Sequence, residues 1–328
     1  MHPVQALKQE LRRMCGLSRF RQRLVFLKEE DDAGDGNVVL DDDCTLKPGE
    51  VQVVLLNFCQ ASEAQVTALR DAARHGLTQE VENILQRPQD PDLAGLGPAP
   101  LFVAAWQGHL AVARLLLEAN ADKDKATDSG MTPLLIAARY GHLELARLLL
   151  ESNADKDKAT DNGVTPLHTT AELGHLEVAR LLLEAHADSD RAMQDGATPL
   201  CLAAQKGHFE VARLLLESNA DVDKARNGGF SPLHAAAQQG HLQVARLLLE
   251  ASADKDKAMQ DGATPLHIAA ENGELEVARL LLEAHADSDR AMQDGATPLQ
   301  IAAQEGYLEL ARLLQGSNMQ NSKRLRLR

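Results

Sequence analysis

The chain has 328 residues, of which 44% are hydrophobic and 25% are charged, an ordinary composition for a globular protein. Its formal net charge of −14 argues against a general nucleic-acid binder, which needs a basic surface to displace counterions from phosphates. No apolar run approaches the ~20 residues of a membrane span, and Met1–Glu10 lacks the apolar segment of a signal peptide. We therefore expect an intracellular, cytoplasmic protein with no membrane span.

Residues 1–60 lie outside the regular pattern that fills the rest of the chain. The segment Val4–Met14 has the apolar spacing of an amphipathic helix that ends near Gly16. Two runs rich in β-branched residues, Arg21–Leu27 and Val51–Phe58, predict strands, and the acidic stretch Glu29–Asn37 between them predicts a loop. We expect a small α+β segment here.

This order resembles the second half of a ubiquitin-like domain, carried by Gly16-Leu17, Arg23–Phe26, Leu40–Asp42, Thr45-Leu46 and Val51–Leu55. The opening hairpin of that fold has no counterpart, so either the domain is truncated or another strand covers the exposed sheet edge. The resemblance implies a link to the ubiquitin pathway and a protein-binding surface on Val25 and Val54. The alternative is that these two are ordinary strand residues. A terminal Gly-Gly is missing, so we do not expect a conjugated modifier.

Residues 61–97 form a transition to the regular part of the chain. The stretch Ala64–Leu85 contains Ala72-Ala73 and His75-Gly76 but not the Thr-Pro-Leu of the later units. Its position fits a capping unit, which a stack of repeats needs because an end unit has one face in water. The Pro- and Gly-rich Arg87–Pro100 predicts a longer loop.

Residues 98–318 repeat with a constant spacing of 33 residues, which predicts stacked units of secondary structure. One segment, Glu184–Leu200, recurs letter for letter at Glu283–Leu299, three periods later, and this indicates a recent internal duplication. The basic residues 319–328 are expected to form a disordered tail. A Thr-Pro-Leu or Ser-Pro-Leu core appears at Thr132, Thr165, Thr198, Ser231, Thr264 and Thr297.

The unit that begins at Thr264 shows how the pattern specifies a helix pair. The Thr264 hydroxyl can cap a helix whose first position is Pro265, where a missing N–H costs nothing. Leu266, Ile268, Ala269 and Ala270 form the buried face of that helix, and Gly273 ends it in the left-handed conformation. A second helix follows over 275–283, with Leu275, Ala278, Leu281 and Leu282 at helical spacing. Such a pair cannot bury its own apolar face and needs stacked neighbours.

These motifs, Thr-Pro-Leu-His with Ala-Ala, then Gly-His-Leu-Glu, Leu-Leu-Leu-Glu and Ala-Asp, resemble the ankyrin repeat. The resemblance covers roughly Ala64–Ser317 and implies a mainly α solenoid preceded by the incomplete ubiquitin-like segment. The chain departs from the family where Phe102, Leu135, Cys201 and Gln300 replace the usual His. It also departs at the end of the second helix, where Asn120, His186, Asn219 and Ser252 replace the usual Gly.

Catalytic and metal-binding patterns are scarce. The histidines His109, His142, His175, His208 and His241 occupy the same Gly-His slot, so we expect hydrogen bonds at the helix start or between repeats rather than ligands. The four cysteines have no metal-type spacing and are expected to be free thiols. Neither a phosphate-binding Gly loop nor a Ser-His-Asp set can be nominated. We expect no enzyme, no cofactor and no small-molecule substrate.

The resemblance places protein binding on the connecting loops and on the exposed end of each first helix. Trp106, Arg139, Tyr140 and Leu173 give the first half of this surface the residue types enriched at interface hot spots, whereas Gln and Glu dominate the second half. The alternative is that Trp106 and Tyr140 pack on their own loops. The candidate residues are Trp106, Gln107, Met131, Arg139, Tyr140, Val164, Glu172, Leu173, Gln205, Lys206 and Phe230.

The sequence thus predicts a scaffold or adaptor that binds a partner protein. An alternative is a nuclear regulatory protein, supported only by the tail Lys323–Arg328, which has the composition of a short import signal. A solvated terminus explains the same tail.

Overall fold

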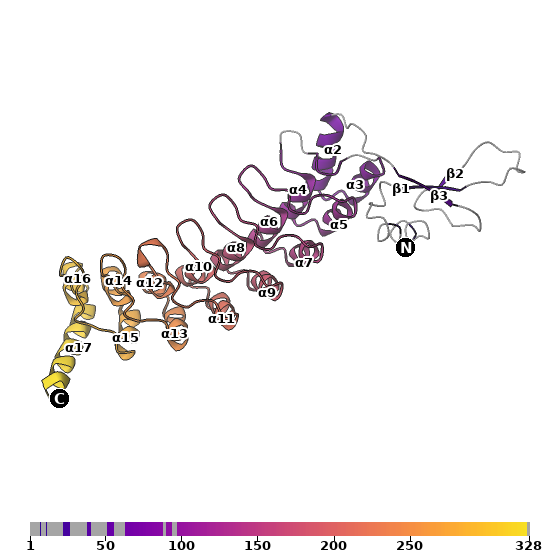
Figure 1. Ribbon diagram of the computed structural model, residues 1–328. Coiled ribbons are helices and arrows are strands. Elements are labelled where there is room, and N and C mark those ends of the chain that lie inside the picture. The colour runs from indigo at the N-terminus through magenta and orange to yellow at the C-terminus, as the bar shows by residue number, and fades with distance from the viewer. Residues whose placement is uncertain are drawn as a thin grey trace, which may run out of the picture. The chain divides into compact units, whose positions relative to one another are not determined.

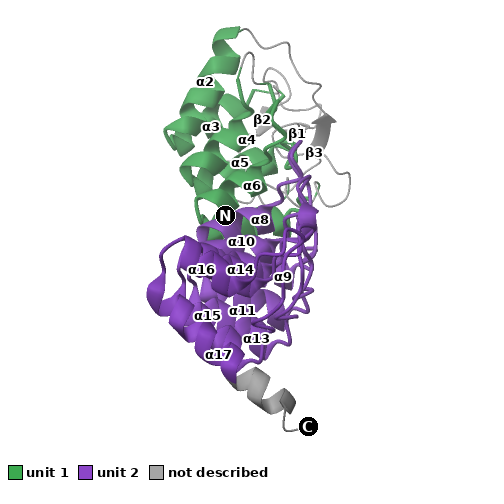
Figure 2. Ribbon diagram, turned by 90° about the vertical axis from the view of Figure 1, so that its left-hand side faces the viewer, with its two compact units in different colours: residues 1–155 green, residues 156–328 purple. Residues whose placement is uncertain are grey.

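In the computed structural model, the described residues are 7, 11, 22–26, 38–40, 51–55, 63–87, 90–93 and 97–326; for the three strands and for residues 320–326 only the backbone is described. The chain divides into two compact units, residues 1–155 and residues 156–328 (Figure 2). Within each unit, pairs of short helices lie side by side, and long loops join one pair to the next (Figure 1).

The N-terminal part of unit 1 contains three described strands, β1 (Gln22–Phe26), β2 (Val38–Leu40) and β3 (Val51–Leu55). They form one sheet in the order β2-β1-β3, and both neighbouring pairs are antiparallel. The two runs predicted as strands contain β1 and β3, whereas β2 follows directly on the predicted loop. Leu7 and Leu11 are helical, and the remainder of the helix expected over Val4–Met14 lies outside the described residues, as does the loop Glu29–Asn37.

The described residues that follow in unit 1 form three helix pairs. The expected capping unit is indeed a pair, α2 and α3, although it lacks the Thr-Pro-Leu core. In each pair the first helix carries an even label and the second an odd label. Their bounds are α2 (Glu63–Arg74), α3 (Thr78–Leu85), α4 (Pro100–Gln107), α5 (Leu110–Glu118), α6 (Pro133–Arg139) and α7 (Leu143–Glu151).

Unit 2 contains five helix pairs and one short 3₁₀ turn, η2 (Asn227–Gly229). The final helix continues to Arg326, past residue 318 where the sequence pattern places the end of the last repeat. The bounds are α8 (Pro166–Leu173), α9 (Leu176–Glu184), α10 (Pro199–Lys206), α11 (Phe209–Glu217), α12 (Pro232–Gln238), α13 (Leu242–Glu250), α14 (Pro265–Asn272), α15 (Leu275–Glu283), α16 (Pro298–Gln304) and α17 (Leu308–Arg326).

Local chemistry sets the ends of the helices, as the sequence predicts. The Thr132 and Thr198 hydroxyls accept the N–H of Leu135 and Cys201 at 3.2 and 3.3 Å. Gly273 ends α14 at φ +75°. The second helices also end in the left-handed region, although no glycine is present: φ is +61 to +68° at Asn120, Asn153, His186, Asn219, Ser252 and His285. The substitutions noted in the sequence therefore keep the family's backbone conformation.

Leucine and alanine form the core. In α14 the whole predicted face, Leu266, Ile268, Ala269 and Ala270, is buried. In the second helix of that repeat, α15, the buried face is wider than the sequence indicated. Val277 and Leu280 are buried with Ala278 and Leu281, whereas Leu275 and Leu282 are half-buried. The reason is that α15 packs against both its own first helix and the second helices of adjacent repeats.

Three buried histidines in unit 2 help to cap the N-terminal ends of first helices. His234 Nδ1 accepts the Ser231 N–H at 3.1 Å, and His234 Nε2 donates to the Ala263 carbonyl of the next repeat at 3.3 Å. His168 makes the same pair of bonds, and Nδ1 of His267 accepts the Thr264 N–H at 3.2 Å. Each ring must be neutral, because Nδ1 can accept a backbone N–H only when it carries no hydrogen.

Burial lowers the pKa of all three histidines, and it lowers the pKa of His234 to about 4. A group whose pKa is depressed by folding stabilises the fold fully above its unfolded pKa of about 6.5 and loses that contribution as pH falls. Acidification from pH 7 to pH 5 should therefore lower the free energy of unfolding by about 2 kcal/mol through His234 alone.

We predict that His234→Gln flattens this pH dependence. Gln300 occupies the equivalent slot, where its Oε1 accepts the Thr297 N–H at 2.9 Å, so glutamine keeps the cap without titrating. Urea unfolding at pH 7.5, 6 and 5 should show the variant losing less stability than the wild type on acidification. Equal losses for the two proteins would mean that His234 is not held neutral by the fold.

Candidate functional site

The ends of the first helices and the tips of the loops, here called fingers, carry the predicted binding residues. A finger is the loop from the end of one second helix to the next first helix, for example residues 186–197. In unit 2 neighbouring fingertips are hydrogen-bonded: the N–H groups of Gln194, Asn227, Gln260 and Gln293 donate to backbone carbonyls of the preceding finger at 2.8–3.1 Å. The fingertips are therefore held in register with one another.

A second ladder runs through the bases of the fingers. Asp188 Oδ1 accepts the Asp190 N–H at 2.9 Å and so closes a local turn. Asp190 Oδ1 accepts the N–H of Asp221 in the next finger, also at 2.9 Å. The same arrangement recurs at Asp223 and Asp254, where burial raises the pKa of the Asp223 carboxyl. These carboxylates join repeats and are already engaged, so they are poor candidates for ligand binding.

A histidine ladder holds the C-terminal ends of the first helices. Nε2 of His208 donates to the Glu172 carbonyl at 3.0 Å, and Nε2 of His241 donates to the Gln205 carbonyl at 3.1 Å. In unit 1, His109 and His142 make the same bond to the carbonyls of Arg74 and Trp106. The predicted inter-repeat role of these four Gly-His histidines is confirmed.

In four repeats the glycine that precedes the second helix makes room for the histidine of the next repeat, whereas Gly240 and Gly273 face Glu274 and Tyr307 instead. At Gly207, φ is +74°, and a Cβ atom would lie 2.7 Å from Cε1 and Nδ1 of His241. The same steric constraint links Gly108 to His142 and Gly174 to His208. Glycine is needed here both for its backbone conformation and for contact with the neighbouring repeat.

In unit 1 the histidine ladder brings two predicted residues together. Trp106 at the end of α4 is 42% exposed, and Tyr140 at the end of α6 is 48% exposed, so neither ring belongs to the core. The Tyr140 ring stacks on His142 with centroids 6.0 Å apart, and His142 Nε2 donates to the Trp106 carbonyl at 3.3 Å. Gln107 and Arg139 beside them are exposed, and Met131 on the finger is half-buried.

The remaining candidates lie in unit 2. Leu173 is 44% exposed and belongs to unit 2, whereas Trp106 and Tyr140 belong to unit 1. Glu172 and Lys206 are exposed, and Val164, Gln205 and Phe230 are half-buried.

Phe230 is part of a cluster that the sequence analysis missed. The Arg226 guanidinium lies over the Phe230 ring, 6.0 Å from its centroid, and donates to Gln205 Oε1 at 2.8 Å. The Phe230 ring also approaches His234, with centroids 5.6 Å apart. The Arg226–Gln205 hydrogen bond ties this finger to α10. The signal available in the sequence was the unusual finger Arg226–Phe230, which contains Gly228-Gly229 where the other fingers between α5 and α16 have a single glycine.

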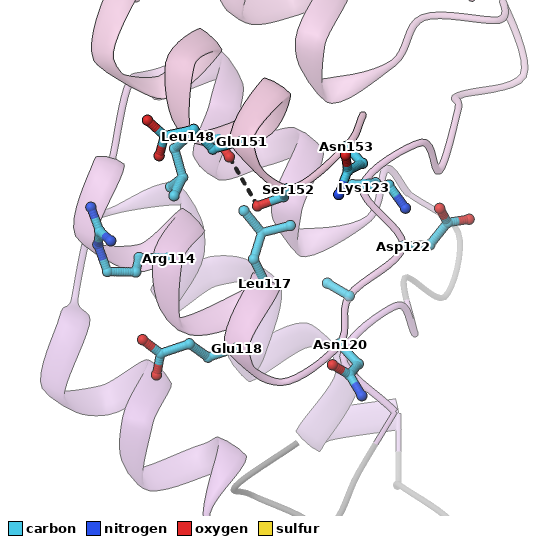
Figure 3. Close-up of a pocket in the computed structure, with 11 residues that line it drawn as sticks. Arg114, Leu117, Glu118, Asn120, Asp122, Lys123, Leu148, Glu151, Ser152 and Asn153 are labelled. Atoms are coloured by element: carbon cyan, nitrogen blue, oxygen red, sulfur yellow. Dashed lines mark hydrogen bonds between the residues drawn. The ribbon is translucent and has the colours of Figure 1, made fainter. Parts of the chain in front are cut away.

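A cavity of about 610 Å³ opens in unit 1 among the C-terminal ends of α5 and α7 (Figure 3). Arg114, Glu118, Glu151 and Asn153 line it, and Ser152 donates to the Leu148 carbonyl at 2.9 Å. It lies on the second helices, and none of the predicted binding residues lines it. Among the residues that the structure describes, no three His, Cys, Asp or Glu side chains are grouped to hold a metal ion.

Comparison with known families explains the repeated geometry. The sequence profile described as ankyrin repeats (3 copies) matches overlapping segments at residues 69–160, 101–193, 154–226, 185–259 and 233–324. The chain belongs to the ankyrin-repeat family. Ankyrin repeats typically act as non-catalytic modules for protein–protein interaction, and the match contains no catalytic domain.

The ankyrin match begins at residue 69, so the ubiquitin-like resemblance of residues 1–60 receives no support from it. A comparison with curated proteins gives no significant match. Across the described part of this ankyrin-repeat chain, every helix is too short or too polar to cross a membrane.

We predict that Gly207→Ala destabilises the ankyrin stack through two effects, left-handed strain and displacement of the His241 ring. The loss should be about 2–3 kcal/mol, of which about 1–2 kcal/mol is strain alone. In a His241→Ala background the ring is already gone, so the same substitution should cost only the strain. Urea unfolding of the wild type, the two single variants and the double variant measures the coupling energy between Gly207 and His241. An equal cost in both backgrounds would mean that the histidine does not constrain the glycine.

Proposed function

We propose that this ankyrin-repeat protein is an intracellular scaffold or adaptor that binds a partner protein on its first-helix ends and fingers. The observation that carries the proposal is the exposed pair Trp106 and Tyr140, whose surroundings are ordered by His142. Tryptophan and tyrosine offer large contact areas at a small cost in side-chain entropy, because each has few rotatable bonds.

The geometry also supports a rigid anchor. A hot spot gains most when its side chains need little reorganisation on binding. The Trp106 carbonyl is hydrogen-bonded to His142, and the Tyr140 ring is stacked on the same imidazole. One histidine thus supports both aromatic residues while leaving their outer surfaces in solvent.

We predict that Trp106→Ala and Tyr140→Ala each weaken partner binding by ~2 kcal/mol or more, about thirtyfold. Gln238 occupies the position of Trp106 four repeats later, and Gln239 occupies the position of Tyr140 three repeats later. Their alanine variants are therefore matched controls with little expected effect. The partner would first be captured from native lysate with the intact chain, and the purified pair would then be titrated by calorimetry.

Melting temperature separates this proposal from a structural role. The two aromatic variants should melt within a few degrees of the wild type, because both rings are largely exposed. A stronger effect of Gln238→Ala or Gln239→Ala on binding would place the interface elsewhere. A large drop in melting temperature for Trp106→Ala would assign its ring to the core.

We also propose that residues 1–60 carry a ubiquitin-like segment that links the scaffold to the ubiquitin pathway. What supports it is the backbone arrangement of a central strand with an antiparallel neighbour on either side, β2-β1-β3. The register pairs Arg23 with Val54, and Arg23 is two residues from Val25, so Val25 and Val54 are diagonal neighbours. That placement is compatible with one shared protein-binding surface.

We predict that the intact chain captures ubiquitin-pathway proteins that residues 61–328 do not capture, while both retain the partner of the ankyrin face. The two forms would be compared in the same native lysate by quantitative mass spectrometry. Recovery of the same set of proteins by both forms would count against the ubiquitin-like role and leave the ankyrin-face proposal standing.

A further inference from the structure

Unit 2 contains a groove near its C-terminal end that none of the predicted site residues lines. It has a volume of about 280 Å³ and lies between the last two repeats, where α14 and α16 are neighbours (Figure 1). We call it the acidic groove. The lining residues that carry the argument are Asp261, His267, Ile268, Glu271, Asp294 and Glu305.

The lining separates into an apolar floor and a charged rim. Ile268 is buried and Met292 and Ile301 are half-buried, whereas Asp261, Glu271, Asp294 and Glu305 are exposed. The lining contains four carboxylates and neither lysine nor arginine. Like charges on one rim repel each other, so the groove favours a ligand that brings positive charge.

Two of the carboxylates are held in place by the fingers. Asp261 Oδ1 accepts the Ala263 N–H at 3.0 Å, and Asp294 Oδ1 accepts the Ala296 N–H at 2.9 Å. The two fingers are joined to each other because the Gln293 N–H donates to the Asp261 carbonyl at 2.8 Å. This wall of the groove is therefore ordered before any ligand arrives, which lowers the entropic cost of binding.

His267 marks the groove as different from the equivalent positions of earlier repeats. The rings of His168 and His234 donate from Nε2 to the carbonyls of Ala197 and Ala263 at 3.1 and 3.3 Å. His267 is only 1% exposed, and its Nε2 has no hydrogen-bond partner. Burial lowers the pKa of His267, and the backbone groups of Ala296 and Arg290 oppose that shift, but neither lies in hydrogen-bonding geometry with Nε2.

The tautomer of His267 limits what can bind. Nδ1 accepts the Thr264 N–H at 3.2 Å, so the hydrogen of the neutral ring is on Nε2. A protonated nitrogen cannot coordinate a metal ion, and a buried N–H without an acceptor favours a ligand that brings a carbonyl oxygen. Positive charge, an aliphatic stem for the apolar floor and a carbonyl oxygen occur together in a lysine or arginine residue of an extended peptide.

We propose that the acidic groove binds an arginine or lysine of an extended basic segment in the partner protein. The cation lies among Glu271, Glu305, Asp261 and Asp294, and its methylene groups contact Ile268 and Ile301. This proposal rests on the proposed role of the helix ends and fingers as the binding face. It adds a charge-specific contact in unit 2 that is separate from the aromatic pair in unit 1.

The test uses a fluorescein-labelled peptide of alternating arginine and alanine, titrated into the full chain by fluorescence anisotropy. The variant Glu271→Gln/Glu305→Gln removes two exposed rim charges with little change in volume. The control Glu177→Gln/Glu184→Gln removes two exposed charges from α9, away from the groove. We expect the rim variant to weaken binding about tenfold and the control by less than about twofold.

Two further measurements test the apolar floor of the groove and the positive charge of the peptide. Ile301→Ser should weaken binding of the arginine peptide, and a peptide with citrulline in place of arginine should bind poorly to the wild-type chain. Equal losses for the rim and control variants would overturn the proposal, because the peptide would then respond only to net charge. Absence of binding to the wild-type chain would overturn it as well.

The same assay keeps this proposal separate from the aromatic anchor. Trp106→Ala and Tyr140→Ala should leave the affinity for the basic peptide unchanged. If those variants abolish peptide binding and the rim variant does not, the basic segment binds at the aromatic pair and the groove is not its site. Loss of partner binding in the aromatic variants, with peptide binding intact, supports both proposals.

Discussion

Burial of apolar surface between neighbouring repeats is the constraint on which the rest of this structure depends. A first helix such as α14 spans only Pro265–Asn272 and buries almost all of its side chains, so it has no stable existence outside a stack. Alanines at its centre, Ala269 and Ala270, let the adjacent first helices approach closely. The hydrogen bonds that recur between repeats place one such helix pair on the next.

Polar ladders determine how the stacked pairs align. Apolar contact is non-directional, whereas a hydrogen bond requires a particular distance and angle. Three separate ladders run within unit 2, through the histidines that follow glycine, the paired aspartates and the fingertip amides. Because each recurs at the same positions of neighbouring repeats, a shift of one repeat against the next would break all three. The period of 33 residues and the ladders are two consequences of the same geometry.

The proposed binding surface consists of positions that have none of these structural roles. Six histidines and several finger aspartates, residue types that often bind ligands, instead make hydrogen bonds between repeats. The positions left free differ from repeat to repeat, and there the chain places Trp106, Tyr140, Leu173 and the rim carboxylates Glu271 and Glu305. A stack held by recurring ladders can vary these positions without changing its fold, which suits a protein that recognises another protein.

Much of this could be predicted from sequence because the determinants are local. The cap at Thr132, the proline that follows it and the left-handed glycine Gly273 act within a few residues, and the spacing of 33 reveals how often they recur. The wider buried face of α15, the Arg226–Phe230–Gln205 cluster and the orphaned nitrogen of His267 could not be predicted. Each depends on atoms that a different repeat brings into contact.

The duplicated segment separates the two kinds of information. Residues 184–200 and 283–299 are identical, and His186 and His285 share the same left-handed φ of 61 and 62°, which the local sequence determined. Their surroundings differ. A Cβ on Gly196 would lie 2.8 Å from the Asn227 nitrogen of the next finger, whereas Gly295 has nothing within 4 Å. Ala197 is buried and Ala296 is half-buried for the same reason. The sequence by itself determined the helix pair and its turns, and only the tertiary structure decided which copy is covered, because burial depends on the neighbour and not on the residues themselves.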